Sequence, residues 1–470
     1  MPTTEHPLLR RLACTVLLSA ALWLAAAAPA AATVQRAVAD TILISGSDEQ
    51  HLKAAHELGA ELHATTLRID LFWDLAEPSQ GVYDDAGYLQ RLEHLVHAAR
   101  AENVQIVITV SRVPRWASDQ SYWAKPPSPA FSGYQAFYPM TSAALDDFER
   151  FAQHLSTLLQ GDVLAYECWN EPNLWTWFYP QQVGGDGLFA ASTYFKYLKR
   201  LSAGIKAGDP GALVIAGATA PGGGNDIWRT SPQRFAQKLK TLGAADYFDA
   251  YSHHPYAIGG TKSFSPASLP LDPGDTVNLA NISTLLKIFP KTAFYLTEYG
   301  YNSRQASSFG VVVGEVAQAS YLKQAYAMAG RHPQIRMLFW YLLRDWSPEG
   351  DQYSDGGVYT GLRRLEGGAK PAWYAFARGN TITLHTPSSA ARGASVRLQG
   401  VYSCAAVGGV AGRPLLLQRR WGSGSWVTLR TVTTGDNGYY KAFVTLKRST
   451  RYRFVFRGVV ASGARLVRMR

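Results

Sequence analysis

Cysteine is scarce in this 470-residue chain, which has only Cys14, Cys168 and Cys404. Cys14 lies in an N-terminal segment that we expect to be removed, and the other two fall in different predicted domains. We therefore expect neither a disulfide framework nor a metal site built from cysteines. The chain also lacks a His-x-x-x-His pair and an acidic loop of cation-binding spacing. The sequence thus predicts no metal and no cofactor.

Long apolar runs are missing everywhere except near the N-terminus. Arg10 and Arg11 precede the apolar stretch Leu12–Ala28, and small residues follow up to Ala32. This order is typical of a secretory signal peptide cleaved near Ala32, and an uncleaved membrane anchor is the alternative. We therefore predict that residues 1–32 are a signal peptide and that the protein is secreted or associated with the cell surface. Export argues against nucleic acid as a partner.

Acidic residues almost vanish at the C-terminal end. Residues 381–470 contain 15 Lys and Arg but one acid, Asp436, so this segment carries +14 while the whole chain carries +11 and residues 1–380 carry −3. Short alternating runs broken by Gly predict a β-sandwich of roughly 90 residues here. A basic face would hold the protein on an anionic cell-wall polymer, an acidic polysaccharide or phospholipid head groups. A soluble domain with a biased surface is the alternative.

Eight apolar runs alternate with amphipathic helical patterns over residues 40–378. This alternation predicts an α/β fold with a parallel sheet, and eight units fit a closed (β/α)8 TIM barrel. An open doubly wound sheet would need a Gly-rich turn after an early strand, which Gly46-Ser47 does not supply. The expected strands are Asp40–Ser45, Thr66–Phe72, Val104–Val110, Val163–Trp169, Leu213–Gly217, Phe248–His253, Thr292–Thr297 and Arg336–Leu342.

Two glutamates stand where expected strands end. Glu171 closes the fourth run within Trp-Asn-Glu-Pro, and Glu298 closes the seventh before Gly300. Side chains at the carboxyl ends of barrel strands share the open mouth. A carboxylate pair about 5–5.5 Å apart hydrolyses a glycosidic bond with retention of configuration. We predict this short separation, with Glu171 as acid/base of raised pKa, Glu298 as nucleophile, and the deeper Glu167 as a structural partner of a buried arginine.

The stretch Trp169-Asn170-Glu171-Pro172-Asn173-Leu174, followed by aromatic residues, resembles the retaining glycoside hydrolases of clan A. Within the clan it looks most like family 39, with the cellulase-like family 5 next. The resemblance covers residues 40–378 and implies cleavage of a polysaccharide or oligosaccharide. The C-terminal segment more loosely resembles immunoglobulin-like β-sandwiches, which implies a non-catalytic binding or spacer role. A catalytically inactive carbohydrate-binding protein and a transglycosidase are the alternatives.

The clan resemblance also implies roles for substrate-binding residues. Arg68 resembles the arginine that supports the nucleophile, and Asn170 the asparagine that bonds the sugar 2-hydroxyl. His254 and Tyr256 resemble a His-x-Tyr pair whose tyrosine contacts the nucleophile. Trp340 resembles the platform under the sugar, although Tyr256 and Trp340 are also consistent with core packing. Further candidates are Arg112, which could meet an anionic sugar or be a plain surface residue, and the loop aromatics Trp123, Trp175, Trp177 and Tyr179.

Overall fold

A computed structural model describes residues 34–258, 264–304, 311–348, 357–377, 380–404, 408–409, 411–456 and 460–470. The expected signal peptide, residues 1–32, lies outside the described residues. Within those ranges, no helix is both long and apolar enough to cross a membrane.

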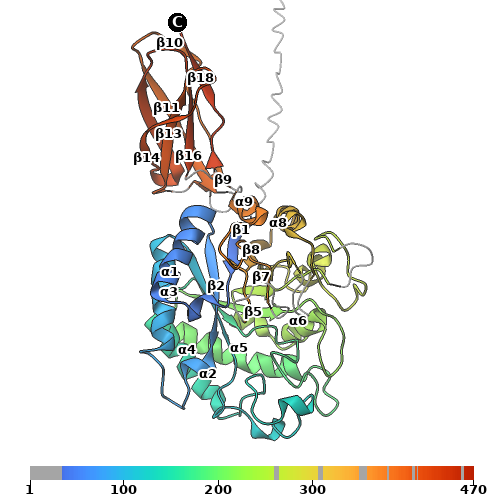
Figure 1. Ribbon diagram of the computed structural model, residues 1–470. Coiled ribbons are helices and arrows are strands. Elements are labelled where there is room, and N and C mark those ends of the chain that lie inside the picture. The colour runs from blue at the N-terminus through green and yellow to red at the C-terminus, as the bar shows by residue number, and fades with distance from the viewer. Residues whose placement is uncertain are drawn as a thin grey trace, which may run out of the picture.

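The larger part of the molecule is a closed parallel barrel of eight strands, in chain order around the ring (Figure 1). Strand β8 pairs with β1 in parallel and closes the cylinder. The strands are β1 (Gln35–Ala39), β2 (Thr66–Phe72), β3 (Gln105–Ser111), β4 (Ala165–Cys168), β5 (Leu213–Thr219), β6 (Ala250–His253), β7 (Ala293–Tyr299) and β8 (Ile335–Tyr341). The (β/α)8 barrel predicted from the sequence is therefore confirmed.

Helices cover the outside of the barrel because their apolar stripes need a buried partner. The main helices are α1 (Asp48–His56), α3 (Tyr88–Ala101), α4 (Ala144–Leu158), α5 (Phe189–Gly208), α6 (Pro232–Thr241), α8 (Glu315–Ala329) and α9 (Pro371–Ala377), and α2 (Trp73–Ala76) and α7 (Ser283–Leu286) are single turns. The outward strand residues and these helices share one buried apolar core.

The first strand was predicted at the wrong place. The expected strand Asp40–Ser45 is instead a loop that contains the 3-10 turn Leu43–Ser45, and β1 precedes it. Ala37 and Ala39 of β1 are fully buried inside the barrel, in one cluster with Phe339 of β8. Small residues fit this interior beside bulky neighbours but carry a weak strand signal, whereas the β-branched run after them carries a strong one.

The C-terminal part consists of two β-sheets around their own apolar core, which confirms the predicted all-β segment. One sheet has the order β10-β18-β16-β13-β14 with β17 beside β16, and the other has the order β12-β11-β15 with β9 beside β11. The bounds are β9 (Asn380–Ile382), β10 (Ser389–Ala390), β11 (Ser395–Cys404), β12 (Gly408–Gly409), β13 (Pro414–Arg420), β14 (Val427–Thr433), β15 (Tyr439–Thr445), β16 (Thr450–Phe456), β17 (Val460–Ala461) and β18 (Arg465–Met469).

The C-terminal sheets pack against the end of the barrel where its strands begin. His63 lies just before β2, and its ring is 4.4 Å from that of Phe456 and 5.2 Å from that of Tyr402. Helix α2, which directly follows β2, lies at the far end of the barrel in Figure 1. The C-terminal part and the carboxyl ends of the strands are thus on opposite sides of the barrel.

Candidate active site

The loop after β4 brings Asn170 and Glu171 over the mouth of the barrel. Trp169 and Glu171 have left-handed φ angles of 67° and 39°, which non-glycine residues seldom adopt. The surroundings hold this bend: the Trp169 indole donates to the carbonyl of Trp177, and the Glu171 backbone N–H donates to the carbonyl of Ala218. Strained backbone of this kind persists only where packing enforces it.

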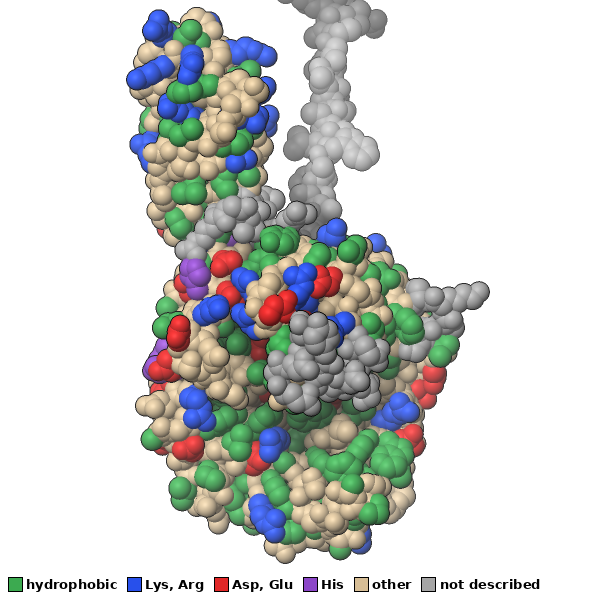
Figure 2. All heavy atoms as spheres, in the orientation of Figure 1, with side chains coloured by type: hydrophobic (Ala, Val, Ile, Leu, Met, Phe, Trp, Pro, Cys, Tyr) green, Lys and Arg blue, Asp and Glu red, His purple; other side chains and the backbone are tan. Residues whose placement is uncertain are grey.

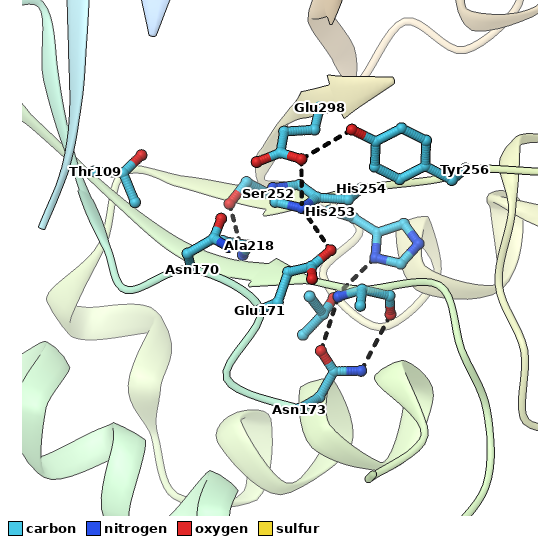
Figure 3. Close-up of polar contacts among 12 residues, drawn as sticks. Thr109, Asn170, Glu171, Asn173, Ala218, Ser252, His253, His254, Tyr256 and Glu298 are labelled. Atoms are coloured by element: carbon cyan, nitrogen blue, oxygen red, sulfur yellow. Dashed lines mark hydrogen bonds and ion pairs between the residues drawn. The ribbon is translucent and has the colours of Figure 1, made fainter. Parts of the chain in front are cut away.

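Asn173 fixes the same loop to the one after β5. Its side-chain amide donates to the carbonyls of Ala220 and Thr230, and its oxygen accepts the Ala220 N–H at 2.8 Å (Figure 3). Asn173 is fully buried, so these contacts leave no room for another role. The motif around Glu171 therefore contains a residue that positions the loop, which sequence reasoning did not identify.

Glu171 and Glu298 face each other across His254 (Figure 3). One carboxylate oxygen from each glutamate and one His254 ring nitrogen all lie within 4.8 Å of one another. His254 Nδ1 is 3.1 Å from Glu171 Oε1 and 3.6 Å from Glu298 Oε2. Since both glutamates come from strand ends far apart in sequence, the barrel itself creates this pair.

Arg68 of β2 is a fully buried cation that organises the floor of the site. It donates from Nε to Glu167 at 2.7 Å, from Nη1 to Glu298 at 2.9 Å and from Nη2 to Asn170 Oδ1 at 2.8 Å. Nη1 also lies 3.1 Å from Asp70 Oδ1. Burial lowers the pKa of Arg68, but the surrounding carboxylates raise it further, so the net shift is upward and Arg68 stays charged.

The predicted neighbours of the two glutamates take different positions. The Tyr256 hydroxyl donates to Glu298 Oε2 at 2.9 Å, and burial raises its pKa, so it remains a donor. His254 faces the carboxylates, whereas the adjacent His253 points away and bonds Thr219 and the Val277 carbonyl. Glu167 is fully buried between Arg68 and the Thr109 hydroxyl, which is the structural position expected of it.

The environment affects the protonation of the three central groups. Burial raises the pKa of Glu171 to about 7, against a smaller opposing effect of Arg68. Burial also raises the pKa of Glu298; His254, when protonated, and the permanent charge of Arg68 lower it. Burial lowers the pKa of His254 to about 4, so its ring is neutral near pH 7. Glu171 therefore holds a proton near neutrality, while Glu298 has the stronger support for a negative charge.

Trp340 does not lie in the mouth, so its expected role as a platform under the sugar is wrong. It is fully buried in the core between strands and helices, and its indole donates to the Thr360 carbonyl at 2.8 Å. Alternation along β8 instead turns Phe339 into the barrel and brings Tyr341 to the cavity beside the glutamates. The period-two pattern could have indicated Tyr341, because the side chains at 337, 339 and 341 share one face.

A cavity of about 770 Å³ opens over the two glutamates. Sequence reasoning missed several of its walls, which come from loops that carry no motif. Besides Asn170, Glu171, Tyr256 and Glu298, its lining includes Thr41, Asp70, Phe72, Trp177, Arg229, Tyr341 and Trp346. Of the loop aromatics proposed from the sequence, Trp177 lines this cavity, whereas Trp123 stacks on Arg115 and Trp175 packs on Trp228.

Two further cavities adjoin this one, on different sides. One of about 460 Å³ shares Ile42 and Trp346 with it. Another of about 290 Å³ shares Thr176 and Trp177 and is lined by Arg112. Arg112 pairs with Asp74, and its guanidinium lies 4.6 Å from the centre of the Phe72 ring. Among the described residues, the cavity that holds the two glutamates thus shares walls with a second cavity at Trp346 and with a third at Trp177.

Glu171, His254 and Glu298 are also the one group of described residues whose ligand atoms are close enough to share a metal ion. Both oxygens of Glu298 already accept hydrogen bonds, from Arg68 and from Tyr256. A guanidinium cation so close would oppose a bound cation. The donor set therefore fits proton transfer and nucleophilic attack better than metal binding.

A closed parallel barrel with facing carboxylates at the carboxyl ends of its fourth and seventh strands is the architecture of a glycoside hydrolase. Residues 33–342 match the family model described as "Cellulase (glycosyl hydrolase family 5)", and the chain therefore belongs to this family. It is a glycosidase that hydrolyses O-glycosyl compounds, with a polysaccharide or an oligosaccharide as its substrate class.

Solved structures share the fold at low identity. A family 39 glycoside hydrolase from Bacteroides cellulosilyticus WH2 is 19% identical, with 91% of this chain and 81% of that chain covered at a TM-score of 0.55. GH5_18 from Streptomyces cattleya, in complex with GlcNAc, is 12% identical, with 74% and 79% covered at 0.53. The β-glycosidase BGL167 is 14% identical, with 74% and 96% covered at 0.50. No curated protein matches the chain.

Proposed function

We propose that this enzyme hydrolyses its glycan by double displacement with retention of configuration. Glu298 attacks the anomeric carbon while Glu171 donates its proton to the departing glycosidic oxygen, which gives a covalent glycosyl-enzyme. Glu171, now ionised, then takes a proton from the water that cleaves this ester and releases Glu298. The separation below 4.8 Å between carboxylate oxygens carries this proposal, because an inverting enzyme needs a wider gap for water.

The surrounding residues support each of these steps. Arg68 and Tyr256 hold Glu298 by its two oxygens and favour its charged form before attack. Arg68 also occupies Oδ1 of Asn170, which leaves the Asn170 amide N–H groups for the 2-hydroxyl of the sugar. The neutral His254 ring contacts Glu171 and orients its carboxyl group.

The test is a pair of isosteric variants with product stereochemistry. Glu171→Gln and Glu298→Gln should each lower kcat by roughly 10³-fold or more, because each removes a group that acts on the reacting atoms. Glu49→Gln, an exposed change of the same kind, should leave kcat unchanged. Proton NMR of the first product formed should show the anomer of the substrate; the opposite anomer contradicts double displacement, and full activity in either variant contradicts the role assigned to that residue.

The position of the glutamates also favours attack on internal glycosidic bonds of a glycan polymer. Cavities continue beyond Trp346 on one side and beyond Trp177 on the other, so sugar units fit on both sides of the scissile bond. A pocket that accepts only a chain end would be closed on one side. We therefore favour a polymeric substrate that lies across the mouth.

We further propose that the enzyme is secreted and that its basic C-terminal part holds it on an anionic cell-wall polymer. The export-type N-terminal sequence supports the first statement and the +14 charge of residues 381–470 supports the second. Residues 1–380, which comprise the N-terminal segment and the barrel, carry a net charge of only −3. Attraction to anions would therefore come from the C-terminal part.

A further inference from the structure

Four arginines of the C-terminal part lie against two tryptophan rings. The guanidinium carbons of Arg420 and Arg453 are 4.8 and 4.2 Å from the ring centre of Trp426. Those of Arg419 and Arg448 are 4.0 and 3.5 Å from the ring centre of Trp421. Stacking of this kind fixes the planar guanidinium and leaves its edge N–H groups available for an anion.

These arginines have no acidic partner. None of them forms an ion pair with any residue that the structure describes, and Asp436 is the only acid between residues 381 and 470. The Nε–H groups of Arg419 and Arg420 are buried and have no hydrogen-bond partner among the described residues. The Arg420 side chain as a whole is only half-buried, so its other N–H groups can reach a ligand that supplies oxygen acceptors.

The strand register puts three arginines on one outward face of the sheet. On β13, Leu415 and Leu417 point into the core, so Arg420 points outward, whereas Arg419 follows the leucines and is opposite the buried Tyr452. Arg420 is directly opposite Arg451 on the neighbouring β16, and Arg453 lies two residues further along that strand. Like charges opposite each other destabilise a sheet unless an anion lies between them. Figure 2 shows Lys and Arg side chains across the visible face of this part of the molecule.

We propose that this Arg–Trp surface binds the carboxylate groups of an acidic polysaccharide. We define the surface as Arg420, Trp426, Arg451 and Arg453. Guanidinium groups pair with carboxylates through two parallel hydrogen bonds, and several such pairs along one chain add up. The half-buried indoles are stacked under arginines, which does not suit insertion into a bilayer. This inference rests on the proposed retention by the C-terminal part and adds the site and the ligand.

The experiment measures binding of the full-length enzyme to immobilised polygalacturonate at low salt. Arg420→Gln with Arg453→Gln should weaken binding roughly tenfold or more, because two charge-assisted contacts are lost. Arg392→Gln with Arg397→Gln removes the same charge from exposed positions outside the surface and should have little effect. Trp426→Leu keeps every charge and should still weaken binding. The unfolding temperature and the hydrolysis rate of a soluble oligosaccharide show whether each variant is folded.

Equal losses in the two arginine pairs would mean that binding senses only net charge, and the Arg–Trp surface would then be rejected. Binding of the wild type to polyphosphate or to phosphatidylglycerol vesicles, but not to polygalacturonate, would reject the carboxylate ligand. A chain that lacks residues 381–470 separates this inference from the proposed retention. If that chain binds as well as the full-length enzyme, retention itself is refuted, and hydrolysis is judged independently on the soluble oligosaccharide.

Discussion

At the scale of single residues, Glu171 and Glu298 share a cavity but differ in what touches them. Glu298 accepts hydrogen bonds from Arg68 and Tyr256, whereas Glu171 contacts only the neutral His254 among the charged and polar side chains that the structure describes around it. Burial without a strong donor favours the neutral acid, and two donors favour the anion. The division of roles between two identical side chains thus follows from their neighbours.

We expect a bell-shaped dependence of kcat/KM on pH. In the proposed mechanism activity requires protonated Glu171, whose pKa burial raises to about 7, so the rate should fall as pH rises through about 7. It also requires ionised Glu298, whose pKa burial raises above 4.5, so the rate falls on the acid side as well. Steady-state kinetics on a soluble oligosaccharide would measure both limbs.

The assignment of Glu171 as the acid that causes the alkaline limb can be tested with the variant Glu171→Ala. Its substrate should be an aryl glycoside whose leaving group needs no protonation. The alkaline limb should disappear in this variant, while the acid limb should remain because Glu298 is intact. An unchanged alkaline limb would show that another group is the acid. Glu49→Ala should keep the profile of the wild type.

At the scale of elements, alternation and motif predicted seven barrel strands and both glutamates, because a strand that ends in a polar side chain leaves a clear signal. The first strand, the aromatic side chain that faces the cavity and the loop residues that line the cavity depend on tertiary contacts that the sequence pattern does not show. Strand β1 has Val38 as its single β-branched residue, and its strand geometry comes from pairing with β2 and β8. Trp340 and Tyr341 are adjacent aromatics, and only the register of β8 decides which of them faces the cavity. The cavity walls Arg229 and Trp346 lie in loops without periodicity.

Ala37→Leu should test the packing inside the barrel. Ala37 is fully buried in the interior cluster with Phe339 and Met337, so a larger side chain should destabilise the protein by about 1–3 kcal/mol. Denaturant unfolding measures the change in the free energy of unfolding. Ala327→Leu on the exposed face of α8 is the matched control and should have little effect. A neutral Ala37→Leu would mean that the interior is not close-packed at β1.

At the scale of the whole molecule, the barrel and the C-terminal part have separate cores, and we propose catalysis for the first and retention for the second. Deletion of residues 381–470 should therefore leave the hydrolysis of a soluble oligosaccharide within about twofold of the full-length rate, because no described residue of this segment lines the main cavity. Sedimentation with anionic cell walls should weaken at low salt, and high salt should weaken the binding of the full-length enzyme too. Equal sedimentation of both proteins would contradict retention by this segment.

The contact of His63 with Tyr402 and Phe456 fixes the direction in which a retained enzyme works. In the proposed retention, the C-terminal part would bind the matrix from the side of the barrel opposite to the glutamates, so the glutamates would face away from the bound glycan chain. Such an enzyme would not cut the glycan chain to which it is bound. It would cleave neighbouring glycan chains within its reach. The glycan that retains the enzyme and the glycan that it cleaves can then be chemically different polymers of the same wall.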